Sequence, residues 1–269
     1  MKQIWMPLIG GLILVYACTT NKVTGKKQLN IISSEQMMSL SDTQYKEVLS
    51  KSKVLTATAD ARKVTDIGKR IAAAVTQYYN AKGMQAEMAT YKWEYNLIDS
   101  KEVNAWCMPG GKIAVYTGLL PVTKNDDALA VVMGHEVAHA LAEHGKQRIH
   151  QQLGTELVSL GLQGMMAGKP QQTQAAFMTA FGAASTLGVI LPFSRKQELE
   201  ADALGLQFAA MAGYNPEEAI PLWQRMGALS AGNKPPEFAS THPAEETRIA
   251  ALQKQMPEAK KLYEQAKRK

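Results

Sequence analysis

Two histidines four residues apart, His135 and His139, flank Glu136 in the segment His-Glu-Val-Ala-His. The apolar residues before them, 128–133, predict a buried helix, and side chains four residues apart project from nearly the same side of a helix. Both imidazoles can therefore bind one metal ion, and Glu136 can serve as general base for a water on the open side of that ion. Zinc, one ion per chain, is the expected metal because it is a redox-inert Lewis acid that lowers the pKa of bound water.

An acidic pair further along the chain, Glu198 and Asp202, has the same four-residue spacing. A catalytic zinc site of this type needs a third protein ligand, frequently a carboxylate from another helix. One carboxylate of the pair can bind the ion while the other holds a ligating imidazole through its second nitrogen. Alone, the pair could be a solvated acidic face with Arg195 and Lys196 as partners. Together with the histidine pair it favours the metal site, and Glu200 is expected to point elsewhere.

A mainly helical chain must position these side chains. Apolar residues recur at helical spacing over most of the sequence, whereas residues 90–117 hold short β-rich runs with a turn at Pro109-Gly110-Gly111. The predicted class is α+β, dominated by helix, with a small antiparallel sheet beside the active-site helix. The expected helices are 33–52, 60–80, 126–144 continuing to about 166, 171–191, 195–212, 216–228 and 244–254, and the expected strands are 91–95, 103–108 and 112–116.

The uncharged stretch from Ala175 to Phe193 is long enough to be a transmembrane helix. Its alanine, glycine, serine and threonine content makes it weakly hydrophobic, so a buried helix or a flap over a cleft is the preferred interpretation.

The composition excludes several classes of protein. With 46% hydrophobic and 20% charged residues, the 269-residue chain is not disordered, collagen-like or a coiled coil. Its net charge of +6 would permit contact with anionic partners, but no aromatic residues interleave with the basic ones, so nucleic-acid binding is not expected. Two cysteines, Cys18 and Cys107, cannot build a disulfide scaffold or a thiolate zinc site, and Cys107 is assigned no chemistry. The sequence does not indicate an oligomeric state.

The N-terminal residues 1–17 contain an uncharged, mostly apolar run, Ile4 to Ala17, that predicts a signal peptide. The segment Leu14-Val15-Tyr16-Ala17-Cys18 resembles the lipobox of bacterial lipoproteins, although Tyr16 is bulkier than that pattern prefers. The resemblance implies acylation of Cys18 and a membrane anchor. A plain secretory signal or an inefficient membrane anchor is the alternative.

The ordered set of motifs resembles the HtpX/BepA/LoiP-like zinc metallopeptidases, metallopeptidase family forty-eight. The likeness extends beyond the two metal motifs and covers about residues 60–255. It implies a gluzincin-type, zincin-like fold in a single metallopeptidase domain, residues 18–269, that is closest to the stand-alone LoiP-like lipoprotein form, because the chain lacks a helical-repeat extension and multiple membrane spans. The segments that carry the additional likeness are Asn104–Gly111, Val115–Leu120, Ala212–Pro216, and Thr241-His242-Pro243-Ala244 with Arg248.

The resemblance also implies a role for each matching residue. His135, His139 and Glu198 are expected to be zinc ligands. Glu136 is expected to be the base that activates water, and Asp202 the carboxylate that supports a ligand. His242 would gate the zinc or stabilise the oxyanion of the reaction, with a helix-capping loop residue as the alternative. His144 and His150 are left unassigned.

Residues from Asn104 and Ala105 onward predict an extended strand that can hold a peptide by strand addition. The expected function is a zinc-dependent endopeptidase of the bacterial cell envelope that cleaves unfolded or flexible proteins, and the family resemblance implies a role in protein quality control. It would be lipid-anchored at the outer membrane and face the periplasm. The alternative is a latent or conditional protease that acts mainly as an envelope chaperone or assembly factor. A third interpretation, an aminopeptidase or a non-peptidase zinc hydrolase, is disfavoured by the strand.

Overall fold

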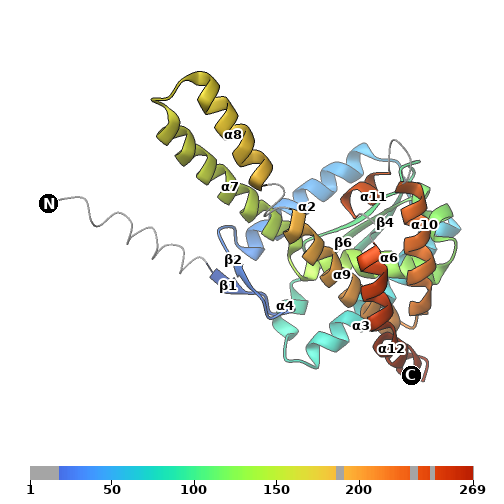
Figure 1. Ribbon diagram of the computed structural model, residues 1–269. Helices are drawn as coiled ribbons and strands as arrows, with labels where there is room; N and C mark the ends of the chain where they lie inside the picture. Colours follow the sequence, from blue (N-terminus) through green and yellow to red (C-terminus); the bar gives the residue numbers. More distant parts are fainter. Residues whose placement is uncertain (1–17, 186–190, 231–235, 243–245, 269) are drawn as a thin grey trace. The chain divides into compact units, whose positions relative to one another are not determined.

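The computed structural model describes residues 18–185, 191–230, 236–242 and 246–268 (Figure 1). The signal peptide expected at 1–17 lies outside the described residues, as do Pro243 and Ala244 of the family-like segment. The described chain forms two compact units: one comprises the residues up to 37 together with 143–196, and the other comprises 38–142 together with 197–269. The expectation of a single domain over residues 18–269 stays a prediction.

The second unit contains a four-stranded sheet with the strand order β3-β4-β6-β5. Its strands are β3 (Val54–Leu55), β4 (Glu94–Ile98), β5 (Ala105–Met108) and β6 (Lys112–Tyr116). The β3–β4 and β5–β6 pairs are antiparallel, whereas the β4–β6 pair is parallel. In the sheet, β6 lies between β4 and β5. Strand β5 is therefore an edge strand. The α+β class dominated by helix is confirmed, and the sheet is mixed.

Helices cover both faces of this sheet. Tyr45 of α2 (Ser34–Lys51) meets the ring of Trp106 edge-on, with ring centroids 5.8 Å apart. On the other face α3 (Ala59–Asn80) comes so close that a Cβ on Gly68 would lie 2.2 Å from Tyr95. Helix α6 (Asp126–Leu141) packs on the same sheet through contacts with β5. The sheet and these helices form the core that carries the predicted metal motif.

Helix α6 begins at a side-chain cap and is then buried on all sides. The Asn125 side chain accepts a hydrogen bond from the Ala128 N–H at 2.8 Å, which satisfies one of the free N–H groups of the first turn. Every residue from Ala128 to Leu141 is buried, so its apolar composition all round the helix is that of a core helix.

Further helices complete the second unit. They are α4 (Gln85–Ala89), η1 (Thr117–Leu119), α5 (Leu120–Thr123), η3 (Pro216–Glu218), α10 (Ala219–Ser230), α11 (Glu237–Thr241) and α12 (Glu246–Ala266), with α9 (Leu191–Met211) contributing from Gln197 onward.

The first unit contains a β-hairpin and a helical hairpin. The strands β1 (Cys18–Thr20) and β2 (Lys27–Leu29) pair antiparallel, and α7 (His144–Met166) packs on α8 (Gln171–Ser185). The expected continuous helix from 126 to about 166 is interrupted at Glu143, whose φ of 56° lies in the left-handed region and ends α6.

The segment from Ala175 to Phe193 is not a buried helix where the structure describes it, because Phe177 on α8 is 41% exposed. Residues 186–190 of this segment lie outside the described residues. Among the helices that the structure describes, none is long and apolar enough to cross a bilayer.

Candidate metal centre

Four buried side chains converge in the second unit. His135 and His139 come from α6, Glu198 comes from α9, and His242 is the residue that follows α11. One ligand atom of each lies within 4.8 Å of the corresponding atom of every other, and none of the four residues is more than 8% exposed. The structure thus brings the three predicted ligands together and adds His242 to them.

The distances within this group suit four ligands around one zinc ion. The Nε2 atoms of His135 and His139 lie 3.0 Å apart, and each lies 3.4 Å from an oxygen of Glu198. Nδ1 of His242 lies 3.3 Å from Nε2 of His135 and 2.8 Å from Oε2 of Glu198. Tetrahedral ligands at about 2.0–2.1 Å from zinc would be about 3.3 Å from one another. Imidazole nitrogen and carboxylate oxygen are also donors that zinc binds, so these residues fit the ion.

Asp202 holds His135 from one turn further along α9. Its Oδ1 lies 3.0 Å from Nδ1 of His135, the ring nitrogen that is not turned toward the other ligands. Arg248 of α12 donates two hydrogen bonds to the Asp202 carboxylate, from Nε at 2.6 Å and from Nη2 at 2.7 Å. A carboxylate in this position fixes the tautomer and the orientation of a ligating imidazole. Arg248 in turn fixes that carboxylate.

Helices α6 and α9 meet at two glycines, which explains how motifs 63 positions apart in sequence share one site. A Cβ on Gly205 would lie 2.6 Å from the Cα atom of His135, and a Cβ on Gly134 would lie 2.6 Å from the carbonyl oxygen of Gly205. Contacts this short require residues without side chains. The close approach brings Glu198 and Asp202 within reach of the two histidines.

The charges within the group shift several pKa values. Burial would lower the pKa of His135, but hydrogen bonds and charges from Asp202 and Glu198 outweigh it and raise this pKa to about 9. Burial would raise the pKa of Glu198, yet hydrogen bonds from the three histidines hold it well below its usual value. Burial dominates for His139 and lowers its pKa. A cation that binds at neutral pH must therefore displace a proton from His135.

Glu136 lies beside the four-residue group without belonging to it. It is 4% exposed, and its Oε1 lies 3.6 Å from Nε2 of His242. Burial raises the pKa of the Cys107 thiol on β5, and the charge of Glu136 adds to that effect. Glu136 is thus close to His242 of the four-residue group, and its helix α6 contacts the edge strand β5.

The strand predicted to hold substrate packs against helix α6, which carries the two histidines. Asn104 is buried and its carbonyl accepts a hydrogen bond from the Tyr116 N–H at 3.0 Å. Ala105 is the first residue of β5 and pairs with Val115 of β6. The other edge of β5 has no partner strand among the described residues.

Aromatic side chains hold His242 in place. The backbone N–H of His242 donates a hydrogen bond to the Phe238 carbonyl at 2.8 Å, which makes His242 the C-terminal cap of α11. The centroid of the His242 ring lies 4.7 Å from that of the Phe238 ring. Phe238 stacks on Trp223, whose ring lies 5.5 Å from the ring of His135. His242 is therefore both a capping residue and a member of the ligand group, which consists of His135, His139, Glu198 and His242.

A sequence model of Peptidase family M48 matches residues 59–256, which is more than half of the chain. This chain belongs to peptidase family M48. The expected family and the expected class of enzyme, a metallopeptidase, are thereby confirmed.

Similar M48 proteins occur in mitochondria and in bacteria. The chain is 37% identical over 179 residues to mitochondrial metalloendopeptidase OMA1 of Schizosaccharomyces pombe, covering 64% of this chain and 49% of that protein. It is 30% identical over 282 residues to OMA1 of Bos taurus, covering 98% and 52%. It is 31% identical over 185 residues to the beta-barrel assembly-enhancing protease of Escherichia coli, covering 65% and 38%. The chain thus spans about half or less of each of these M48 relatives.

Two features of the M48 site were not predicted from the sequence. Arg248 was noted only as part of the family likeness, although its hydrogen bonds to Asp202 complete the support of His135. Gly205 was not singled out, although a glycine inside a helical pattern is a signal of close helix packing.

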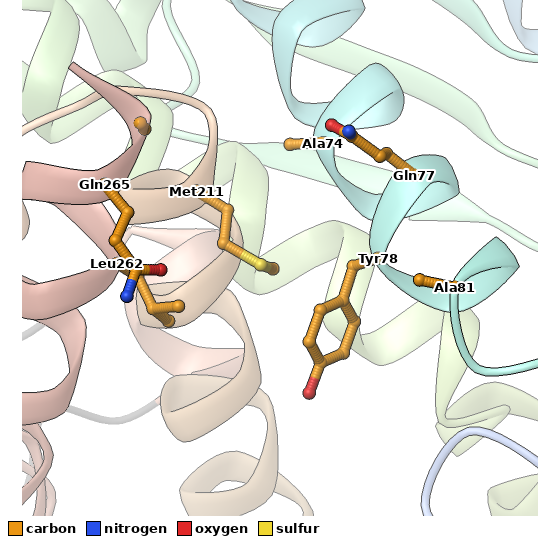
Figure 2. A pocket seen from close by; sticks show the side chains of 8 residues that line it. Ala74, Gln77, Tyr78, Ala81, Met211, Leu262 and Gln265 are labelled. Atoms are coloured by element: carbon orange, nitrogen blue, oxygen red, sulfur yellow. The ribbon is translucent and has the colours of Figure 1, made fainter. Parts of the chain in front are cut away.

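A cavity of about 320 Å³ lies elsewhere in the second unit, among α3, α9 and α12 (Figure 2). It contains no member of the ligand group, and Tyr78 is the only titratable side chain in its lining. The lining residues are Ala74, Gln77, Tyr78, Ala81, Met211, Leu262, Gln265 and Ala266.

Proposed function

We propose that the chain is a zinc-dependent endopeptidase with one zinc ion. The observation that supports this most strongly is the convergence of His135, His139 and Glu198 with Glu136 beside them. A zinc ion there would polarise the scissile carbonyl and lower the pKa of a water molecule. Glu136 would accept the proton of the attacking water and then donate it to the leaving amine, while Asp202 keeps His135 oriented.

The proposed substrate is an unfolded or flexible segment of a polypeptide. An extended peptide can pair with the outer edge of β5 from Ala105 onward, and this pairing would hold the peptide straight beside Glu136. Folded segments cannot offer their backbone in this way. The OMA1 relatives are named metalloendopeptidases, and this also favours internal cleavage over removal of terminal residues.

The exchange Glu136→Gln tests the proposed activity. It should keep bound zinc and the fold while casein cleavage falls by about 100- to 10,000-fold, because the proton transfer is lost. Elemental analysis, circular dichroism and a casein digest measure the three properties. Glu200→Gln is the matched control on α9, outside the ligand group, and should cleave normally. Equal proteolysis by the Glu136→Gln chain and the unaltered chain would refute the assignment.

The proposed place of action is the bacterial cell envelope, with a role in protein quality control. The lipobox-like segment before Cys18 supports a lipoprotein of LoiP-like form, held at the outer membrane and facing the periplasm. Mass spectrometry of the mature N-terminus should find an acylated cysteine. Cys18→Ser should remain uncleaved and lose that mass. An unmodified mature N-terminus at another residue would contradict the lipid anchor.

A second candidate function is a latent protease that acts mainly as a chaperone or assembly factor in the envelope. The position of His242 favours it, since Nδ1 lies 2.8 Å from the ligand Glu198 and this ring can fill the site that substrate needs. Under this hypothesis His242→Ala raises casein cleavage at unchanged zinc content. Under the first proposal the same variant cleaves at the same rate or more slowly.

A further inference from the structure

One face of α7 exposes an unusual set of large apolar side chains. Leu157, Val158, Leu160 and Met165 are 53–79% exposed, and at 100° per residue they fall within an arc of about 160° around the helix. Phe177 on the neighbouring helix α8 is exposed as well. The two helices form an antiparallel hairpin (Figure 1). Soluble proteins rarely leave an apolar face of this size open to water without a partner.

The opposite side of α7 is also apolar. Leu162 and Met166 lie on it and are only partly exposed. By contrast, a Cβ at Gly161 or Gly164, on the open face, would have no atom within 4 Å. A helix that is apolar on both sides needs a second apolar environment in addition to its partner helix.

The charges around the hairpin indicate what kind of surface it meets. From Leu157 to Lys196 the sequence contains no Asp or Glu and three cations, Lys169, Arg195 and Lys196, all of them exposed. Because these three charges have the same sign, they offer no ion pair between two copies of the segment. An exposed apolar face in a segment whose only charges are cations is the pattern that binds a bilayer containing anionic lipid.

The N-terminal part of the chain is tied to the base of this hairpin. The uncharged run from Ile4 to Ala17 leads directly into β1, and Gln28 of β2 is hydrogen-bonded to Glu143. The Gln147 side chain of α7 also donates to the Gln28 side chain at 3.0 Å. A chain brought to a membrane by its N-terminus therefore brings the hairpin there too, and this step rests on the proposed lipid anchor.

We infer that the α7–α8 hairpin is a second membrane-contact site, which lies in the headgroup region of one leaflet of a bilayer that contains anionic lipid. The uncharged part of α7, from Leu157 to Met166, is about 15 Å long at 1.5 Å per residue. This is half of the roughly 30 Å hydrocarbon core, so the uncharged part of α7 is too short to span it. Interfacial helices bury their apolar face by about 5–10 Å, which suits the exposed arc of α7.

The test places an environment-sensitive fluorophore on a cysteine at Leu160 or Leu157, in the full zinc-loaded chain with Cys107→Ser. The matched control is Gln163→Cys, an exposed position on the other side of α7. The chain is reconstituted into vesicles of phosphatidylethanolamine and phosphatidylglycerol with brominated acyl chains. Both leucine positions should be quenched severalfold more strongly than the glutamine position. Replacing phosphatidylglycerol by phosphatidylcholine should reduce that difference.

Equal quenching at the three positions, or none, would overturn the inference. So would shielding of the Leu160 fluorophore without lipid, whether by a second copy of the chain at high concentration or by added casein. The measurement needs no peptidase activity, so the Glu136→Gln chain should give the same quenching. Failure of the membrane contact therefore leaves the proposed peptidase intact, and failure of the peptidase leaves the quenching result intact.

Discussion

The exchange Asp202→Asn separates the effect of Asp202 on zinc affinity from its effect on the free energy of unfolding. Asp202 is 3% exposed, lies 3.0 Å from Nδ1 of His135 and accepts two hydrogen bonds from Arg248. Asparagine has nearly the same size and keeps one acceptor oxygen, so the exchange removes the negative charge without opening a cavity. The effect on the site is therefore electrostatic.

Two losses are expected from this exchange. Loss of the partner of a ligating histidine weakens metal binding by about 10- to 100-fold, equal to about 1.4–2.8 kcal/mol. Removing one member of a buried ion pair lowers the free energy of unfolding by about 3–5 kcal/mol. Because asparagine still accepts one hydrogen bond from Arg248, the expected loss is about 3 kcal/mol, the lower end of that range.

Competition with a chromophoric chelator measures the zinc Kd, and urea titration of the metal-free chain measures the free energy of unfolding. The control Glu200→Gln removes a carboxylate two positions earlier on the same helix and should change stability by less than about 0.5 kcal/mol. A structural role alone would lower the stability of Asp202→Asn without altering zinc affinity in the folded protein. An unchanged Kd would refute the argument that Asp202 orients His135.

Three further outcomes follow from the packing and burial of single residues. Gly205→Ala should destabilise the protein by about 1–3 kcal/mol or more in a urea titration, and weaken zinc binding, because its Cβ would lie 2.6 Å from the Cα of His135. Gly161→Ala, where a Cβ meets nothing within 4 Å, should instead stabilise the protein by about 0.5–1 kcal/mol, and a loss of stability would contradict this. Because burial raises the pKa of Cys107, its thiol stays protonated at pH 8. Cys107 is half-buried, so its alkylation, followed by peptide mass spectrometry, should be at least about tenfold slower in the native chain than in urea, and equal rates would contradict the raised pKa.

Helical spacing alone was enough to predict the helices that carry the ligands. The four-residue spacings of His135 with His139 and of Glu198 with Asp202 survive in the structure because both pairs lie on regular helices. The expected strands 103–108 and 112–116 were close to β5 and β6, since β-rich runs and a glycine turn mark them, whereas the expected strand 91–95 begins three residues before β4 (Glu94–Ile98). The parallel pairing of β4 with β6 was not predictable in the same way, because periodicity identifies the face of a strand and not its neighbour.

Contacts between distant segments account for what the sequence did not show. Arg248 reaches Asp202 across 46 positions, and the approach of Gly205 to His135 spans 70, so neither distance leaves a local pattern. The interruption at Glu143 was missed for a different reason. A glutamate in the left-handed region contradicts the usual preference of that conformation for glycine or asparagine, so the residue type gave no warning.

The division of the chain gives a bound ion a mechanical role. The segment 143–196 of the first unit is an excursion from the second unit, and it leaves three residues after His139 and rejoins one residue before Glu198. An ion bound by both His139 and Glu198 would hold together the two ends of a loop of about 60 residues and so restrict their motion. Chelation should then speed amide exchange at both junctions together. A change in the length of the segment 143–196 would leave this link between His139 and Glu198 in place.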